Sequence, residues 1–203
     1  MYYRQASNQY INDGMSFTID GTTYPAEVLR DASAEVLQSF GLELVVATNE
    51  PANRNFYNVT EEYNGATVTY INTPMDLTAI RERLWTQIKS HRDYVKTNGG
   101  CLVQGKWFHS DTDSKQQQIA LVIMGANIPA NLQWKTLDGS FVTMTQSLAS
   151  EIFVAQVVRE QSIFTVAENK RAAIANMTIE QLEAYDVLDG FPQEYVDEAL
   201  IQP

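Results

Sequence analysis

The alternation of apolar and polar side chains is clearest in the middle of the chain. Apolar side chains recur there every three or four residues, which is the spacing of one buried stripe on an α-helix. The stripe consists of Leu77, Ile80, Leu84, Ile88 and Val95. Asn98-Gly99-Gly100 follows, and glycine readily adopts the left-handed backbone conformation that closes a helix. The pattern predicts a helix that ends at these glycines.

Two β-hairpins and a second helix are predicted after the glycines. Alternating apolar residues around a glycine-containing turn indicate each hairpin, and short oxygen-bearing side chains indicate the start of the helix. The hairpin turns fall at Gln104-Gly105 and Asp138-Gly139, and the helix begins at Ser110-Asp111-Thr112-Asp113 and carries Ile119, Leu121, Val122 and Met124.

The chain past Thr145 is predicted to be helical, with apolar residues over a wide face. They are Leu148, Ile152, Phe153, Ala155, Val157, Val158, Ile163, Phe164 and Val166. A wide face predicts burial against more than one neighbour, whereas a coiled coil needs a narrower seam. Thr178-Ile179-Glu180-Gln181 has the capping-box pattern that starts a further short helix. One or two more acidic turns are expected over Pro192 to Leu200.

Residues 1–74 have the pattern of a small β-rich unit. Asp20-Gly21 and Asn64-Gly65 are turn dipeptides between short runs rich in aromatic and β-branched residues, which predicts two hairpins. Ser33 to Gly41 has the start and stop signals of a short helix, and Leu42–Ala47 is expected to form one strand. The whole chain is therefore predicted to be α+β, with a small β-rich N-terminal module at residues 1–74 and a helical domain with two β-hairpins at residues 76–203.

The net charge of −11 is unevenly distributed along the chain. Residues 76–135 hold eight basic and five acidic side chains, whereas residues 1–75 hold three and nine and residues 136–203 hold three and eleven. The overall charge argues against a nucleic-acid-binding protein, because polyphosphates require a basic surface. A basic middle between acidic ends is consistent with attraction between the parts of the chain or to neighbouring subunits, or simply with solvated faces of mixed sign.

Other sequence features bear on the compartment. The single Cys101 cannot form an internal disulfide, and no apolar run approaches the roughly 18 residues of a membrane span. The first residues lack the basic and apolar regions of a signal peptide. We expect synthesis in a cytoplasm and no membrane insertion.

The order of motifs in the second half resembles a domain of unknown function at the end of many tail-fibre and tail-fibre-assembly proteins of tailed bacteriophages. The matching positions cover about half the chain. They are the basic helix from Lys89 to Lys96, Gly99-Gly100, Val103 to Gly105, Phe108, Ser110-Asp111, Ser114, Trp134-Lys135, Asp138-Gly139 and Thr143 to Thr145.

The first half is similar to the N-terminal module of many small phage tail proteins. The similarity rests on Tyr24-Pro25, Leu29, Ser33, Phe40-Gly41-Leu42 and Phe56-Tyr57. Together the two resemblances imply a structural component of a bacteriophage tail, fibre- or baseplate-associated, made in the host cytoplasm and located in the virion. Its partners would be other tail proteins, and a homo-oligomer is compatible with this role. The alternatives are a tail-fibre assembly chaperone and a host-surface glycan-binding or glycan-degrading protein.

Candidate catalytic and metal-binding groups are few. His109, Asp111 and either Cys101 or Ser110 would supply a base and a nucleophile, but Ser110-Asp111 is better explained as a helix start. Asp111 and Asp113 lack the glycine and the distal glutamate of a calcium loop. Glu61-Glu62 is a further carboxylate pair, in a chain where surface acids are common. We therefore predict no enzymatic activity, no cofactor and no metal site.

Aromatic residues are the remaining candidates. Trp85, Trp107 and Trp134 would suit a sugar-stacking platform, but their places in the predicted helix and hairpins favour packing. The tyrosines of the N-terminal module are better candidates for a protein interface, because tyrosine suits surfaces that are partly dry and partly wet. These interface candidates are Tyr2, Tyr3, Tyr10, Tyr57, Tyr63 and Tyr70. The acidic, aromatic stretch from Glu183 to Glu198 is either a lid that packs on the domain or a docking segment.

Overall fold

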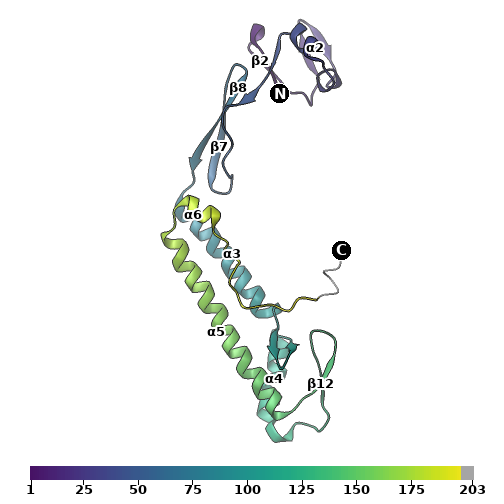
Figure 1. Cartoon of the computed structure of the whole chain (residues 1–203), viewed down its shortest axis with the longest axis vertical. Coiled ribbons are helices and arrows are strands. Elements are labelled where there is room, and N and C mark those ends of the chain that lie inside the picture. Colours follow the sequence, from purple (N-terminus) through teal and green to yellow (C-terminus); the bar gives the residue numbers. More distant parts are fainter. Residues whose placement is uncertain (198–203) are drawn as a thin grey trace. The chain divides into compact units, whose positions relative to one another are not determined.

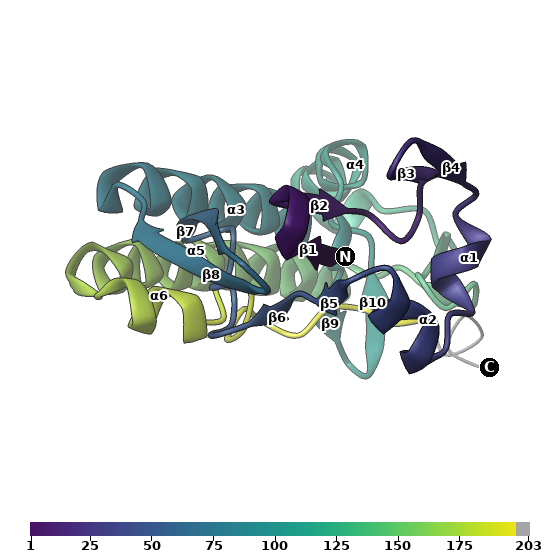
Figure 2. The same cartoon turned by 90° about the horizontal axis from the view of Figure 1, so that it is seen from above.

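The computed structural model describes residues 1–197 and divides the chain into two compact units (Figures 1 and 2). Unit 1 spans Met1–Asp76, and unit 2 begins at Leu77. Both three-stranded sheets belong to unit 1, and the long helices belong to unit 2. The fold class is α+β, as the sequence predicts.

Unit 1 is built from short strands. Its elements are β1 (Tyr2–Arg4), the 3₁₀ helix η1 (Gln5–Ser7), β2 (Gln9–Ile11), β3 (Phe17–Ile19), β4 (Thr22–Tyr24), α1 (Glu27–Arg30), α2 (Ala34–Ser39), β5 (Leu42–Leu44), β6 (Val46–Ala47), β7 (Tyr57–Asn64) and β8 (Thr67–Pro74). The predicted hairpins are confirmed as β3–β4 and β7–β8. The Asp20-Gly21 turn of the first has positive φ at both residues, 48° and 81°.

The strand expected over Leu42–Ala47 is wrong in one respect, because it is two strands in different sheets. β5 pairs with β1 in a sheet of order β2-β1-β5, whereas β6 runs parallel to β8 in a sheet of order β6-β8-β7. The change of partner falls at Val45, whose N–H donates to the Met1 carbonyl, while the Val46 N–H donates to the Ala66 carbonyl. The two sheets are thus joined through one residue.

The core of unit 1 lies under the first sheet and the β3–β4 hairpin. Its buried residues are Ile11, Phe17, Ile19, Leu29 and Leu42. Phe17 stacks on Tyr24 with ring centroids 5.3 Å apart, and the Phe40 ring lies 5.0 Å from that of Tyr24. Three aromatic rings thus contact one another in or beside the core of this small unit.

Unit 2 follows the predicted order of helices and hairpins. Its elements are α3 (Leu77–Asn98), β9 (Cys101–Val103), β10 (Lys106–Phe108), α4 (Thr112–Met124), the 3₁₀ helix η2 (Gly125–Asn127), β11 (Gln133–Lys135), β12 (Phe141–Thr143), α5 (Gln146–Asn176) and α6 (Ile179–Ala184). Side chains of Asp111, Thr145 and Thr178 cap the starts of α4, α5 and α6, each by accepting a backbone N–H three residues on. The predicted helix starts are therefore confirmed.

The 31-residue helix α5 is the element on which unit 2 is assembled. In Figure 1, α3 lies along the C-terminal half of α5 and α4 along its N-terminal half, and both contact it. The Arg81 guanidinium of α3 donates to the Ile174 carbonyl at 3.0 Å, and the Gln156 side chain of α5 donates to Gln118 of α4. Both shorter helices run antiparallel to α5.

The prediction that the wide apolar face of α5 is buried is wrong for half of that face. Ile152, Ile163 and Ile174 are buried, in one stripe that α3 and α4 share because they contact the same side of α5. Val157 and Val158 project away from this stripe and are 53% and 60% exposed. The periodicity of the sequence predicted the width of the apolar face correctly. It could not predict that α3 and α4 both pack against the same stripe of that face.

The segment after α6 packs on unit 2, as expected for a lid. Phe191 meets the His91 ring edge-on with centroids 4.8 Å apart, and Tyr195 lies 6.1 Å from Trp107. The further helical turns expected from Pro192 are wrong for residues 192–197, which form no helix. The remainder of that stretch, to Leu200, lies outside the described residues.

Candidate interaction surfaces

Three of the six candidate tyrosines form a cluster in unit 1. The rings of Tyr3 on β1 and Tyr10 on β2 are 5.1 Å apart, and that of Tyr63 on β7 lies 5.0 Å from Tyr10. The Tyr10 hydroxyl donates to the Gly65 carbonyl at 3.1 Å, so this cluster ties the first sheet to the turn of the β7–β8 hairpin. The Tyr63 hydroxyl donates to Glu61 at 2.6 Å, which raises the pKa of Tyr63.

Two of the remaining tyrosines share a face with this cluster. Side chains alternate along a strand and pair across a hairpin, so residues 57, 61 and 63 of β7 share the face that carries residue 70 of β8, which lies opposite Glu61. Tyr57 and Tyr70 are both half-buried on this face. Tyr2 instead packs against the core of unit 1. Five of the six candidates therefore lie on or beside one face of the β7–β8 hairpin.

A second surface lies on α4 and α5 in unit 2, although the sequence pattern predicted burial for two of its residues, Phe153 and Val157. Ion pairing of Lys115 with Glu160 and hydrogen bonding of Gln118 with Gln156 fix the antiparallel register of the two helices. This register, together with helical spacing, places four apolar residues on one side of the pair. They are Ile119, Ile123, Phe153 and Val157. All four are exposed, Ile123 by 80%. We call these four residues the apolar patch.

The residues considered as a nucleophile and its base instead hold the backbone together. The buried Ser110 hydroxyl donates to the Thr97 carbonyl and accepts the Gly100 N–H, both at 3.0 Å. Asp111 caps α4 and accepts from Ser114, which lowers the pKa of Asp111. Burial raises the pKa of the Cys101 thiol above its ordinary value. The contacts of Ser110 and Asp111 therefore stabilise the stretch of chain that connects α3 to α4.

A buried glutamine pair continues this network. Gln118 and Gln156 both donate to the His109 carbonyl, at 3.1 and 3.2 Å, and Gln156 also donates to Gln118. Every buried side-chain donor and acceptor in the described residues has a partner. Because unpaired polar groups are costly in a core, this network fixes how α4 approaches α5.

The loop of the β11–β12 hairpin carries a second polar cluster. The Asp138 carboxylate accepts from the Thr136 and Ser140 hydroxyls and from the Lys106 ammonium, the last at 2.9 Å. These hydrogen bonds hold the pKa of Asp138 well below its ordinary value. The cluster fastens the loop to β10, where the Leu137 N–H also donates to the Trp107 carbonyl at 2.8 Å.

The three tryptophans lie in three different settings. Trp134 packs against the core formed by α4, α5 and the β9–β10 hairpin. Trp107 faces Tyr195, and the Trp85 ring has the Arg171 and Lys89 cations over it at 5.0 and 5.7 Å. All three are half-buried. Their separate neighbours do not form the sugar-stacking platform that the sequence raised as an alternative.

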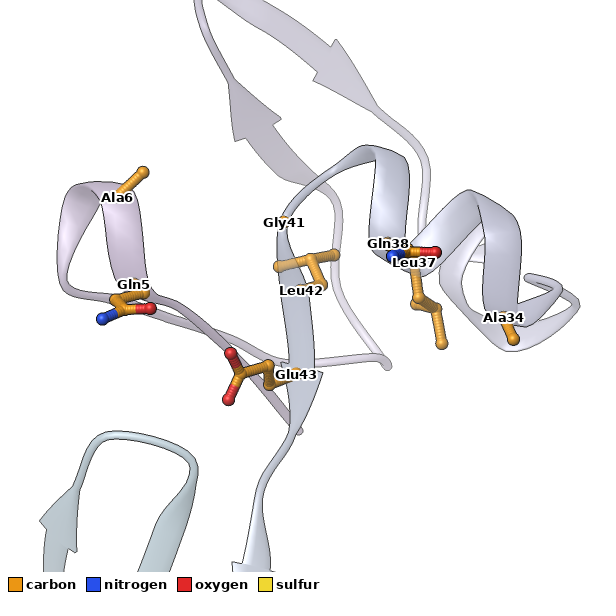
Figure 3. A pocket seen from close by; sticks show the side chains of 8 residues that line it. All are labelled: Gln5, Ala6, Ala34, Leu37, Gln38, Gly41, Leu42 and Glu43. Carbon is orange, nitrogen blue, oxygen red and sulfur yellow. The ribbon is translucent and has the colours of Figure 1, made fainter.

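A shallow hollow of about 520 Å³ opens on unit 1 (Figure 3). Figure 3 shows Gln5 and Ala6 on the turn after β1, Leu42 and Glu43 on β5, and Ala34, Leu37 and Gln38 on α2. Glu43 is the one titratable side chain in this lining, and its neighbours offer amides and apolar groups. The hollow can therefore donate and accept hydrogen bonds, and it lacks a partner for acid–base chemistry at Glu43.

Metal-binding clusters and membrane-spanning helices are both absent from residues 1–197. No group of three or more His, Cys, Asp or Glu side chains is arranged there to hold a metal ion. No helix within that range has the length and apolar character needed to cross a bilayer.

Comparison with known families assigns unit 2 to a protein class. The family described as a domain of unknown function (DUF4376) matches residues 79–188, which is more than half of the chain. The chain belongs to this family. The matched stretch runs from the first turn of α3 to the residues just after α6. No curated protein and no solved structure matches the chain.

Proposed function

We propose that the chain is a structural component of a bacteriophage tail, a fibre- or baseplate-associated subunit that acts through protein–protein contacts. In this role it is made in the host cytoplasm and becomes part of the virion tail. The motif order of both halves of the sequence supports this proposal, because each half resembles a segment of phage tail proteins.

The observation that carries the contact role is the apolar patch on α4 and α5. Isolated exposed apolar residues are ordinary, but adjoining ones on a rigid pair of helices are typical of protein interfaces. Ile123 and Val157 are exposed by 80% and 53%, although a buried hydrogen bond and an ion pair hold α4 against α5 beside them. The tyrosine-bearing face of the β7–β8 hairpin offers a second contact surface of suitable chemistry.

Quantitative mass spectrometry of purified virions tests this proposal. A tail component should be present at a fixed copy number per particle, and it should stay with tails that have been separated from heads. Presence in the infected cell together with absence from particles would refute the structural role and favour the assembly chaperone. Release of sugars from host polysaccharide by the purified chain would favour the glycan-directed alternative.

A further inference from the structure

The pair formed by α3 and α5 has two sides, and the chain's own C-terminal segment covers one of them. Neighbouring residues of a helix project about 100° apart, so consecutive positions mark different sides. His91 contacts Phe191 of the C-terminal segment, whereas Arg92 lies over the Phe164 ring of α5. In the same way Lys170 contacts the segment and Arg171 lies over Trp85.

The covered side shows what kind of chain this helix pair accepts. Lys170 donates to the Asp186 carbonyl at 3.0 Å and lies 5.0 Å from the Tyr185 ring. Arg159 donates to the Gln193 carbonyl at 2.8 Å. The segment from Tyr185 to Asp197 is irregular and acidic and carries three aromatic residues. Side chains of the two helices thus hold an irregular, acidic segment through its backbone carbonyls and its aromatic rings.

The other side also combines cations with aromatic rings, and α3 and α5 themselves supply all of those described below. On α3 the residues Trp85, Lys89, Arg92 and Lys96 are spaced four, three and four apart, which places them on one face of the helix. Phe164 and Arg171, seven residues apart on α5, complete what we call the cationic strip. Lys96 and Arg92 lie 5.7 and 5.0 Å from the Phe164 ring, which is itself 40% exposed.

Positive charge exceeds negative charge along this strip. Arg92 pairs with Asp93 at 2.8 Å, and Arg171 approaches Glu168 at 3.6 Å. No carboxylate of residues 1–197 lies within ion-pair distance of Lys89 or Lys96. The pKa of Asp93 is lowered, first because Arg92 donates a hydrogen bond to it and then because the charges of Arg92, Lys96 and Lys89 are near. A carboxylate of a partner protein would be attracted by the same positive charges of Lys89, Arg92 and Lys96.

We propose that the cationic strip is a docking site for an extended, acidic, aromatic-containing peptide segment of a partner protein. The excess of positive charge along the strip, together with the cation and ring contacts that hold the chain's own segment on the opposite side, is the reason for this choice. A chain of net charge −11 repels the dense charge of a polyphosphate more strongly than the sparser charge of an acidic peptide, and a bare polyphosphate offers no aromatic ring to the strip. The inference rests on the proposed function only in that both require a protein partner.

Fluorescence anisotropy with the full chain tests the site directly. The probe is a fluorescein-labelled peptide with the sequence of residues 185–197, which carries the required charges and rings. It should bind saturably at low salt and release as salt is raised, because exposed ion pairs are screened. Absence of saturable binding to the wild-type chain would overturn the proposal. The titration uses the purified chain alone, so its failure is separate from the virion experiment.

Charge reversal on the strip identifies where the peptide binds. The double variant Lys89→Glu and Lys96→Glu should bind about tenfold or more weakly. The control Arg54→Glu and Lys135→Glu changes the net charge equally at two exposed residues outside the strip and should bind as wild type. An equal loss in both variants would overturn the site.

Two further variants distinguish binding at the strip from binding on the covered side of the helix pair. The milder pair Lys89→Gln and Lys96→Gln, checked for an unchanged far-ultraviolet circular dichroism spectrum, should weaken binding by an intermediate factor. Binding that is lost in Lys170→Met and kept in the strip variants would mean that the peptide displaces the chain's own segment, and would overturn the proposal.

The chemistry of the occupant is tested with two other probes. A peptide with alanine at the three aromatic positions should bind several-fold more weakly than the parent, because the rings contribute beyond the carboxylates. Equal binding would overturn the aromatic part of the proposal. A single-stranded oligonucleotide of similar charge should bind more weakly than the peptide, and tighter binding would identify a general polyanion site instead.

Discussion

Substitution of Gly100 by alanine should destabilise unit 2, and the structure allows the cost to be divided into two parts. Gly100 has φ of +72°, a conformation that costs an L-residue about 1–2 kcal/mol. An added Cβ would also lie 2.6 Å from Leu137 Cδ1, 3.1 Å from Trp107 Cε3 and 3.3 Å from the Phe108 carbonyl oxygen. Leu137 would have to move, and overpacking of this kind costs about 1–3 kcal/mol more.

Gly105 offers a matched control for the backbone part. Its φ is +73°, nearly that of Gly100, and nothing lies within 4 Å of the position of its Cβ. Gly105→Ala should therefore show the conformational cost alone, about 1–2 kcal/mol. The difference between the two variants, about 1–3 kcal/mol, measures the contact with Leu137 and its neighbours.

Urea unfolding followed by tryptophan fluorescence is the suitable assay. Trp85, Trp107 and Trp134 all lie in unit 2, so the signal reports that unit without interference from unit 1. The unfolding midpoint should fall in the order wild type, Gly105→Ala, Gly100→Ala, with similar slopes. Equal midpoints for the two variants would refute the packing of Leu137 on Gly100 described above.

Four further outcomes are expected. Ser110→Ala should lower the free energy of unfolding by about 1–3 kcal/mol, because the buried Gly100 N–H loses its acceptor; an unchanged urea midpoint would contradict this. Asp138, whose pKa is lowered in the folded chain, contributes stability above the pKa of the unfolded carboxyl, and this stability is lost as pH falls through the folded pKa. Thermal melts should therefore show a smaller loss of stability below about pH 4 for Asp138→Asn than for wild type. Ile123→Ser, at an 80% exposed site, should leave stability within about 0.5 kcal/mol and weaken co-purification with tail proteins, whereas a large stability loss would mean that Ile123 is packed in solution. The buried Cys101 thiol, with its raised pKa, should react with iodoacetamide at neutral pH far more slowly than in urea, which mass spectrometry of the intact chain can follow.

The elements that the sequence predicted correctly have local signals. α3 ends at a glycine pair, α4 and α5 begin at side chains that cap them, and the β9–β10 hairpin turns at Gln104-Gly105, where both residues have positive φ. Each of these signals acts within a few residues of its own position. For that reason they can be recognised without knowledge of the rest of the fold.

Features that depend on distant partners were missed. β1 and β2 carry little periodicity, and β1 is identified as a strand by its pairing with β5, some forty residues later. The break at Val45 arises because two sheets compete for one stretch of chain. Phe153 and Val157 were assigned to a buried face because they fit a wide helical stripe, and they remain exposed because α3 and α4 both contact one side of α5.

The candidate interface residues show the same limit. Tyrosine content pointed to unit 1, but the register of β7 and β8 was needed to show which side chains share a face. The cationic strip had a partial signal in the basic residues of the 76–135 segment. One of its two aromatic residues, Phe164, comes from a helix some seventy residues further on, and no pattern within either helix predicts that contact.

The position of α5 near the end of unit 2 has a consequence for synthesis on the ribosome. α3 and α4 are made first, and the helix against which both of them pack emerges after them. Until then Ile80 and Ile88 lack the helix against which α3 packs, so the nascent chain carries an uncovered apolar helix until α5 has been made. Unit 2 should consequently acquire protease resistance only after release of the residues up to Asn176, in one late step.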